Sequence, residues 1–377
     1  NAMMVDSTAL PEQAVRDVLA SSFQSAGQRC SALRCLYLQE DVADHTLEML
    51  YGAMEELALG DPANLFTDVG PVIDEEARQG IADYVAAARA EGRVLKEMTA
   101  PNGGTFIAPT VIRVKGIENM AREIFGPVLH VATFKAGEID KVVAAVNATG
   151  YGLTFGLHTR IDDRVQAVVD ALQVGNTYVN RNQIGAVVGS QPFGGEGLSG
   201  TGPKAGGPEY LARFTKAPTP GADADDRETP ETDIAAALRL DRATAHPERA
   251  LVLPGPTGES NRLTFVPRAP ILCLGPSAAA ALAQAEAVRA LGGHAVEAPG
   301  LAPAALTRLN GFSGALWWGD AEGARARARA LAARKGPILP LIGTLPDAGH
   351  ALLERHVCID TTASGGNAQL LAEVSGS

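Results

Sequence analysis

Short apolar segments alternate with amphipathic helical patterns along most of this sequence, and this alternation constrains the fold more than any other feature. Helices are predicted where apolar residues recur three or four positions apart, over 11–26, 41–59, 74–90, 139–147 and 162–172. Apolar runs predict strands over 35–38, 93–97, 111–114, 128–134, 153–159 and 177–180. Alternating strands and helices indicate an α/β fold, an open and mostly parallel sheet with flanking helices.

The same alternation resumes in the last third of the chain and predicts a second α/β domain. Its strands are predicted over 271–274, 295–296, 315–318 and 338–342, and its helices over 277–291 and 321–335. Residues 217–233 are acidic, rich in proline and without apolar periodicity, which is typical of a linker. We therefore divide the chain into a domain at 1–216, a linker at 217–233 and a domain at 234–377, ending in a small, polar surface tail around 363–367.

Composition narrows the class of protein. The net charge of −11 argues against a nucleic-acid or anionic-membrane partner, since both need basic patches. No apolar run approaches the roughly 20 residues of a membrane span, and the first residues do not resemble a signal peptide. The four cysteines form no CxxC pair and have no histidine at ligand spacing, so we expect a reducing, cytoplasmic setting and no metal site.

Cys30 is the first candidate for chemistry. It follows the helix predicted to end near Gly27 and precedes the strand predicted near Arg34, so it lies on a tight connection that can present a thiol and its own N–H to a cleft. A nucleophilic cysteine needs this reach and a setting that favours the thiolate. The alternative is a small buried apolar residue, the usual role of a free cysteine.

Two further segments are candidates for ligand binding. In Arg122-Glu123-Ile124-Phe125-Gly126-Pro127, a carboxylate and an aromatic ring precede a Gly-Pro turn, which suits either a binding lip or a loop whose ring fills the core. The segment from Ile184 to Gly200 is rich in glycine, and Gly195-x-Gly197-x-x-Gly200 matches GxGxxG. We reject it as a dinucleotide fingerprint because Pro192 and Phe193 precede it and no helix follows.

Together these segments resemble the catalytic part of the aldehyde dehydrogenase superfamily. The strings GQRCSALR, IGAVVGSQPFGGEGLSGTGPKAGGP and VDSTALPEQ are similar to the 1-pyrroline-5-carboxylate (glutamate γ-semialdehyde) dehydrogenase module of bifunctional proline utilization A proteins, over about residues 1–215. The tail HVCIDTTASGGNAQLL resembles the C-terminal domain of the longer members of that group.

The resemblance implies a role for each candidate residue. Cys30 would attack the aldehyde to give a thiohemiacetal, with its own N–H donating to the oxyanion; hydride would pass to NAD+, and water would hydrolyse the thioester to glutamate. Glu123 would bind the ribose hydroxyls of NAD+, with Phe125 packed beside it.

The remaining implied roles concern the substrate, glutamate γ-semialdehyde. Its carboxylate would be anchored by Ser31, Gly185 and Ala186. Phe193 would form one wall of an aromatic box around its carbon chain.

The resemblance also implies missing parts, because the family places its NAD-binding domain, general-base glutamate and oxyanion asparagine before the cysteine. Only 29 residues precede Cys30. We therefore expect a C-terminal piece of a longer cytoplasmic protein, or one peripheral to a membrane, whose upstream domains include an FAD-dependent proline dehydrogenase. Asn1-Ala2-Met3 is either a tag remnant or native. We expect the piece alone to be inactive and to form homo-oligomers.

Two other functions remain open on the sequence. The first is a non-catalytic scaffold, with residues 234–377 used for assembly or to cover a tunnel. A Cys–His hydrolase would need a histidine base, but His130 and His158 lie on predicted strands between apolar residues, which is typical of core histidines.

Overall fold

The computed structural model of the protein describes residues 1–225, 228–241 and 249–362. The predicted tail at 363–367 lies outside these residues. Contacts divide the chain into two compact units, unit 1 (Asn1–Ser190, Leu253–Asn261 and Val357–Ser377) and unit 2 (Gln191–Val252 and Arg262–His356). This division is interleaved, whereas the sequence suggested a continuous division at 217–233. The chain passes from one unit to the other between residues 190 and 191 and within three strands whose bounds the sequence did not predict.

Helices and strands of both predicted α/β regions are present. Unit 1 contains β1 (Ala2–Val5), α1 (Pro11–Phe23), η1 (Gln24–Gly27), β2 (Cys35–Gln39), α2 (Glu40–Glu55), α3 (Glu75–Ala90), β3 (Val94–Glu97), β4 (Thr110–Arg113), η2 (Ile117–Asn119), β5 (Val128–Phe134), η3 (Ala136–Glu138), α4 (Ile139–Ala148), β6 (Tyr151–Gly152), β7 (Thr154–His158), α5 (Asp162–Ala171) and β8 (Asn176–Val179).

Unit 2 contains β9 (Glu196–Gly197), η4 (Leu211–Phe214), α6 (Glu231–Asp241), β12 (Ile271–Cys273), α7 (Ala278–Ala290), β13 (Ala295–Glu297), η5 (Pro303–Thr307), β14 (Gly314–Leu316), α8 (Ala321–Ala332), β15 (Leu341–Ile342) and α9 (Ala348–Ala351). Three further strands have residues in both units: β10 (Arg249–Leu253), β11 (Glu259–Pro267) and β16 (Leu352–Asp360).

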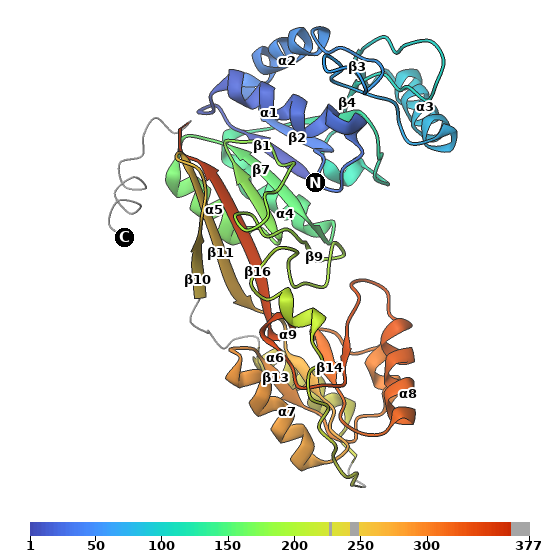
Figure 1. The fold of residues 1–377 in the computed structure, drawn as a ribbon, viewed down its shortest axis with the longest axis vertical. Helices are drawn as coiled ribbons and strands as arrows, with labels where there is room; N and C mark the ends of the chain where they lie inside the picture. The colour runs from blue at the N-terminus through green and yellow to red at the C-terminus, as the bar shows by residue number, and fades with distance from the viewer. Residues whose placement is uncertain (226–227, 242–248, 363–377) are drawn as a thin grey trace. The chain divides into compact units, whose positions relative to one another are not determined.

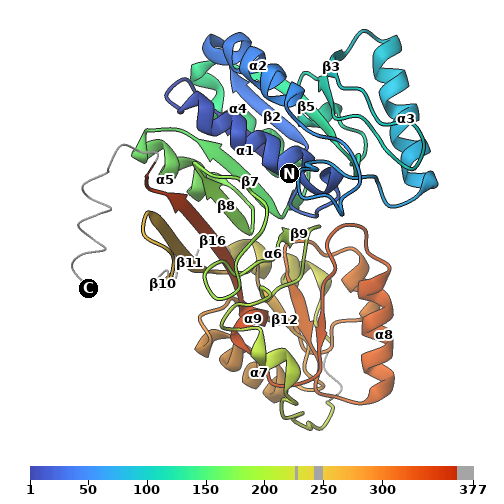
Figure 2. The same cartoon turned by 45° about the horizontal axis from the view of Figure 1, so that its top comes forward.

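The large sheet has the strand order β10-β11-β16-β8-β7-β1-β2-β5-β4-β3. From β8 to β4 the neighbours in this order pair in parallel, and β3 pairs antiparallel with β4. This is the mostly parallel sheet that the sequence predicted. Helices α1 and α2 lie together against one face of β1 and β2 (Figures 1 and 2).

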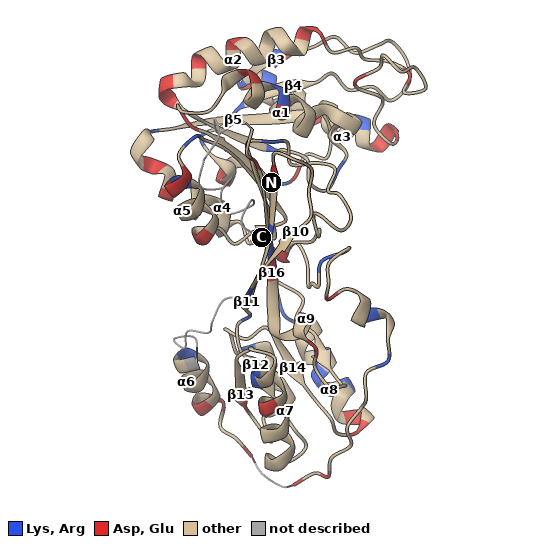
Figure 3. Ribbon diagram, turned by 60° about the vertical axis from the view of Figure 1, so that its left-hand side comes forward, with Lys and Arg blue, Asp and Glu red and all other residues tan. Residues whose placement is uncertain are grey.

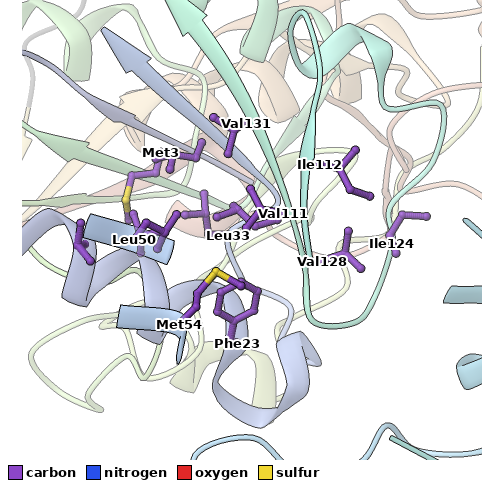
Figure 4. Packing of buried hydrophobic residues seen from close by; sticks show 14 of the residues in the cluster. Met3, Phe23, Leu33, Leu50, Met54, Val111, Ile112, Ile124, Val128 and Val131 are labelled. Carbon is purple, nitrogen blue, oxygen red and sulfur yellow. The ribbon is translucent and has the colours of Figure 1, made fainter. Parts of the chain in front are cut away.

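The central strands are buried on both faces, as parallel strands covered by helices must be. In β1, Met3 and Val5 belong to the core beneath α1, α2 and α3, while Ala2 and Met4 belong to the core beneath α4 and α5. Successive side chains of a strand point to opposite faces, which explains this division. Figure 4 shows the first core, where Phe23 at the end of α1 lies beside Met54 of α2.

Unit 2 has its own parallel sheet, in the order β13-β12-β14-β15. Helices α7 and α8 begin at Ser277 and Asp320, whose side chains cap the backbone N–H groups of the first turn. Trp317 lies in the core of unit 2, and the indole N–H of the buried Trp318 donates to Thr344 O.

Several predicted boundaries differ from the structure. The first helix ends at Phe23 rather than 26 because Ser25 and Ala26 adopt positive φ angles of 55° and 52°. The second ends at Glu55 rather than 59. Helix α6 begins at Glu231, inside the predicted linker, because Ile234 and Leu238 are buried in the core of unit 2.

Acidic side chains are carried on the outer helices of unit 1, including α2 and α5 (Figure 3). Within the described residues, no helix is both long and apolar enough to span a membrane. The same part of the chain holds no group of three or more His, Cys, Asp or Glu residues that suits a metal ion.

Candidate active site

Cys30 lies exposed on residues 24–34, here called the thiol loop, between α1 and β2. The loop turns through left-handed backbone conformations at Ser25, Ala26 and Gly27. Gly27 has φ +66°, and a Cβ added to it would lie 2.2 Å from Gly126 O. Glycine is therefore required here, because the thiol loop packs directly on the backbone of residues 121–127.

Hydrogen bonds from distant segments hold the thiol loop. The Asn1 carboxamide donates to Cys30 O at 2.8 Å and to Ala32 O at 3.0 Å. Leu33 N donates to Ser21 O at 2.9 Å, which ties the end of the loop to α1. Among the described residues, none accepts a hydrogen bond from Cys30 N–H, so this amide can donate to a ligand.

Residues 121–127, here called the carboxylate loop, lie against the thiol loop. Ile124 is buried in the same core as Ala26 and Leu33 of the thiol loop. Glu123 and Phe125 instead face solvent, with exposed fractions of 52% for the Glu123 side chain and 45% for Phe125. A carboxylate accepts hydrogen bonds at both oxygens, so this pair suits a ligand with a diol beside a flat ring.

Arg34 joins the two loops. Its guanidinium lies 3.0 Å from Glu123 Oε1 and donates to Gly126 O at 3.1 Å and to Arg29 O at 3.4 Å. Its Cζ lies 4.8 Å from the centre of the Phe125 ring. Arg34 is only 2% exposed, so its charge is balanced almost entirely by these contacts.

The predicted carboxylate-anchoring residues also adjoin the thiol loop. The Gln183 amide donates to Ser31 O at 3.0 Å, which joins residues 183–186 to the residue after Cys30. Gly185 has φ +72° and is exposed, while Ala186 is half-buried. No described residue accepts from Gly185 N–H or Ala186 N–H. These two amides can therefore donate to a ligand, and their role beside Ser31 in binding an anion stays a prediction.

Phe193 belongs to unit 2. It is half-buried and pairs with Ala205 through two backbone hydrogen bonds of 3.0 and 2.9 Å. Its assignment to the substrate wall stays a prediction.

The two histidines considered as bases are core residues, as expected. His130 on β5 and His158 on β7 are buried, and burial lowers the pKa of each to about 4. His130 Nδ1 contacts Arg34 O at 2.9 Å, and Tyr84 Oη lies 2.8 Å from its Nε2. Because Arg34 O is an acceptor, Nδ1 carries the proton and Nε2 accepts from Tyr84.

Arg34, Asn1 and Gln183 were not among the site residues predicted from the sequence. A charged residue directly before the wholly buried strand β2 was the available signal for Arg34, because a charge in that position needs partners. Asn1 and Gln183 act through amides on loops, and no periodic pattern marks such residues.

Residues 1–219 match the aldehyde dehydrogenase family. The chain is 41% identical over 430 residues to the "Bifunctional protein PutA" of Escherichia coli strain K12. This alignment covers 98% of this chain and 33% of that protein. It is 41% identical over 220 residues to a "1-pyrroline-5-carboxylate dehydrogenase" of Bacillus cereus, covering 58% of this chain and 42% of the relative. The chain thus spans about a third of the length of the PutA relatives that it matches.

Solved structures agree with these sequence matches. A variant of proline utilization A from Bradyrhizobium japonicum is similar with a TM-score of 0.55 and 55% identity, covering 57% of this chain and 22% of that one. A 1-pyrroline-5-carboxylate dehydrogenase from Thermus with bound NAD has a TM-score of 0.53 and 36% identity, covering 56% of this chain and 41% of the other.

Proposed function

Because the chain belongs to the aldehyde dehydrogenase family, we propose that it carries the nucleophile and the substrate anchor of a 1-pyrroline-5-carboxylate dehydrogenase, which oxidises glutamate γ-semialdehyde to glutamate in proline breakdown. The observation that carries this proposal is the exposed thiol of Cys30 on a loop packed against the loop that presents Glu123 and Phe125. The choice of glutamate γ-semialdehyde as the substrate rests on the names of the relatives.

The first chemical step uses Cys30. Its thiolate attacks the carbonyl carbon of the aldehyde, a C–S bond forms, and the carbonyl electron pair moves to oxygen to give a thiohemiacetal. Cys30 N–H, which no described residue accepts from, is available to donate to that oxygen. A donor aimed at the developing oxyanion is typically worth 10²–10³ in rate.

Substrate binding uses the donors beside the nucleophile. The Ser31 hydroxyl and the N–H groups of Gly185 and Ala186 would hold the carboxylate of the substrate. Neutral donors that are already in place bind an anion without a buried counter-charge. The Gln183 bridge to Ser31 O keeps this anchor in register with the thiol loop.

The residues present fit NAD+, which when bound supplies the hydride acceptor of the reaction. Glu123 would accept from its ribose hydroxyls, and Phe125 would pack beside it. The NAD-bound Thermus relative supports this choice of cofactor. We propose that upstream parts of the same polypeptide supply the rest of the NAD+ site, the general base, the second oxyanion donor and an FAD-dependent proline dehydrogenase domain.

The test uses the longer protein that contains this chain. We expect NADH formation from glutamate γ-semialdehyde and NAD+, and a loss of more than about 10³-fold in kcat for Cys30→Ala. Cys273→Ala removes a buried thiol of unit 2 and is the matched control, with activity expected near that of the unaltered protein. An unaltered protein that forms no NADH would support the scaffold function instead.

The isolated chain of 377 residues is the second arm. We expect it to form no NADH under the same conditions. Turnover by this chain at the rate of the longer protein would refute the proposed need for upstream domains.

A further inference from the structure

We propose that Arg34 is a positioning residue that locks the thiol loop and the carboxylate loop in one register. In this role it sets the separation between Cys30 and Glu123 and aims the Glu123 carboxylate at the cofactor. This inference rests on the proposed function, since it assigns NAD+ to Glu123.

The contacts of Arg34 reach both loops through one planar group. Nη2 donates to Arg29 O, directly before the nucleophile, and Nη1 donates to Gly126 O in the carboxylate loop. Nε lies 3.0 Å from Glu123 Oε1. Because the guanidinium is rigid, movement of one loop must break a hydrogen bond to the other or move it as well.

The same contacts leave the two oxygens of the Glu123 carboxylate in different settings. Oε1 is held by Arg34, whereas Oε2 has no hydrogen-bond partner among the described residues. The exposed Oε2 is thus the atom left for a ligand, and Arg34 determines where it points. An unpaired carboxylate on an exposed loop would sample several rotamers instead.

The backbone of Arg34 is also fixed by hydrogen bonds. Its N–H donates to Asn1 O at 3.2 Å, and its carbonyl oxygen accepts from His130 N and His130 Nδ1, both at 2.9 Å. Tyr84 on α3 fixes the other nitrogen of that imidazole. The guanidinium therefore projects from a backbone that β1, β5 and α3 hold in place, which suits a positioning role.

The first experiment uses this chain and does not depend on enzymatic activity. Hydrogen exchange by mass spectrometry compares Arg34→Gln with Arg89→Gln, which removes an exposed arginine paired with Glu97. We expect Arg34→Gln to speed exchange in both 24–34 and 121–127 by at least about fivefold, and the control to change neither. A change in only one loop, or in neither, would overturn the proposal. Should Arg34→Gln not fold, Arg34→Lys carries the same expectation, because one ammonium cannot reach both carbonyl oxygens and the carboxylate.

The second experiment measures the dissociation constant of NAD+ by calorimetry in the longer protein. Arg34→Gln and Glu123→Gln should each weaken binding about tenfold, and the double variant no more than about tenfold, because both remove one oriented carboxylate. Effects that multiply to about a hundredfold would show that Arg34 acts independently of Glu123 and would overturn the proposal. An unaltered protein that does not bind NAD+ would refute the proposed function, while the hydrogen-exchange result would still decide the contact between the loops.

Discussion

The thiol loop of unit 1 and the segment 191–207 of unit 2, here called the glycine loop, are both irregular segments fastened by a buried cation. Arg34 and Lys204 are each 2% exposed. The Lys204 ammonium donates to Gly194 O, and the backbone N–H of Lys204 donates to Glu354 Oε2. The carboxylates differ: Glu354 is 7% exposed, whereas half of the Glu123 side chain faces solvent. A buried cation contacts both loops, but only the thiol loop is paired with a carboxylate that is half exposed to solvent.

The choice of cation follows from this difference. Burial lowers the pKa of Lys204 to about 7, against the opposing effects of Glu354 and Glu196. Burial also lowers the pKa of Arg34, but an arginine stays protonated in proteins. The cation that holds the thiol loop therefore keeps its charge, whereas the cation that holds the glycine loop can lose its proton.

The largest expected difference between the units is in thiol reactivity. Burial raises the pKa of Cys273 to about 12, so its thiolate fraction at pH 8 is about 10⁻⁴, whereas Cys30 is exposed. We expect a limiting dose of iodoacetamide to label Cys30 at least about 100-fold faster than Cys273, as mapped by mass spectrometry. Cys30→Ser should remove the fast phase, and comparable labelling of both cysteines would contradict the assignment.

Gly27→Ala tests how tightly the loops of unit 1 meet. The new Cβ would collide with Gly126 O and must also adopt a positive φ, so we expect a loss of about 3 kcal/mol in the free energy of unfolding. Gly92→Ala is the control, because Gly92 has φ +68° with nothing within 4 Å of its Cβ position; it should cost about 1 kcal/mol. If urea unfolding shows equal losses of stability for the two variants, backbone strain alone accounts for the glycine at position 27, and the close contact with Gly126 does not.

Lys204→Met asks whether the glycine loop depends on its cation in the same way. We expect a loss of about 2 kcal/mol, since Gly194 O loses a donor and buried Glu354 loses the favourable charge of Lys204. Amide exchange at Phe193 and Ala205 should speed up.

Two further variants sharpen this result. Adding Glu354→Gln should recover part of the loss, because the uncompensated carboxylate is then gone. Lys141→Met, at a side chain 76% exposed, should change stability by less than about 0.5 kcal/mol. Unchanged stability in Lys204→Met would show that the cation does not fasten this loop.

The smallest expected effect is the acid sensitivity of the support behind Arg34. The pKa of His130 falls from 6.5 in the unfolded chain to about 4, so only the unfolded state gains a proton as pH falls through this window. Stability is therefore lost on acidification, by about 1.2 kcal/mol between pH 7 and 5.5. Asp17, whose pKa burial raises to about 6, contributes in the opposite direction. The difference in unfolding free energy between the unaltered chain and His130→Gln isolates this contribution, and a difference that does not vary with pH would contradict it.

Local pattern alone was enough for most of the helices and central strands and for the exposed position of Cys30. The strand at 128–134 has the predicted bounds, and α3 begins directly after Asp74, whose carboxylate accepts from Ala77 N. The tight connection that exposes Cys30 and the burial of His130 and His158 were also predicted correctly. Each of these depends on neighbours within a few positions, which is the range over which hydrophobic periodicity and capping are visible in a sequence.

The tertiary structure alone decided which polar residues are buried and how the two loops meet. Strand β16 includes Glu354, Arg355 and His356, so it shows no regular apolar pattern. Arg34 is buried because Glu123 and Gly126, 89 and 92 positions away, supply acceptors for its N–H groups. The apolar periodicity of a sequence depends only on the preference of each side chain for water. A buried charge is stable only where partners from distant segments replace that water, and these partners come together only when the chain has folded.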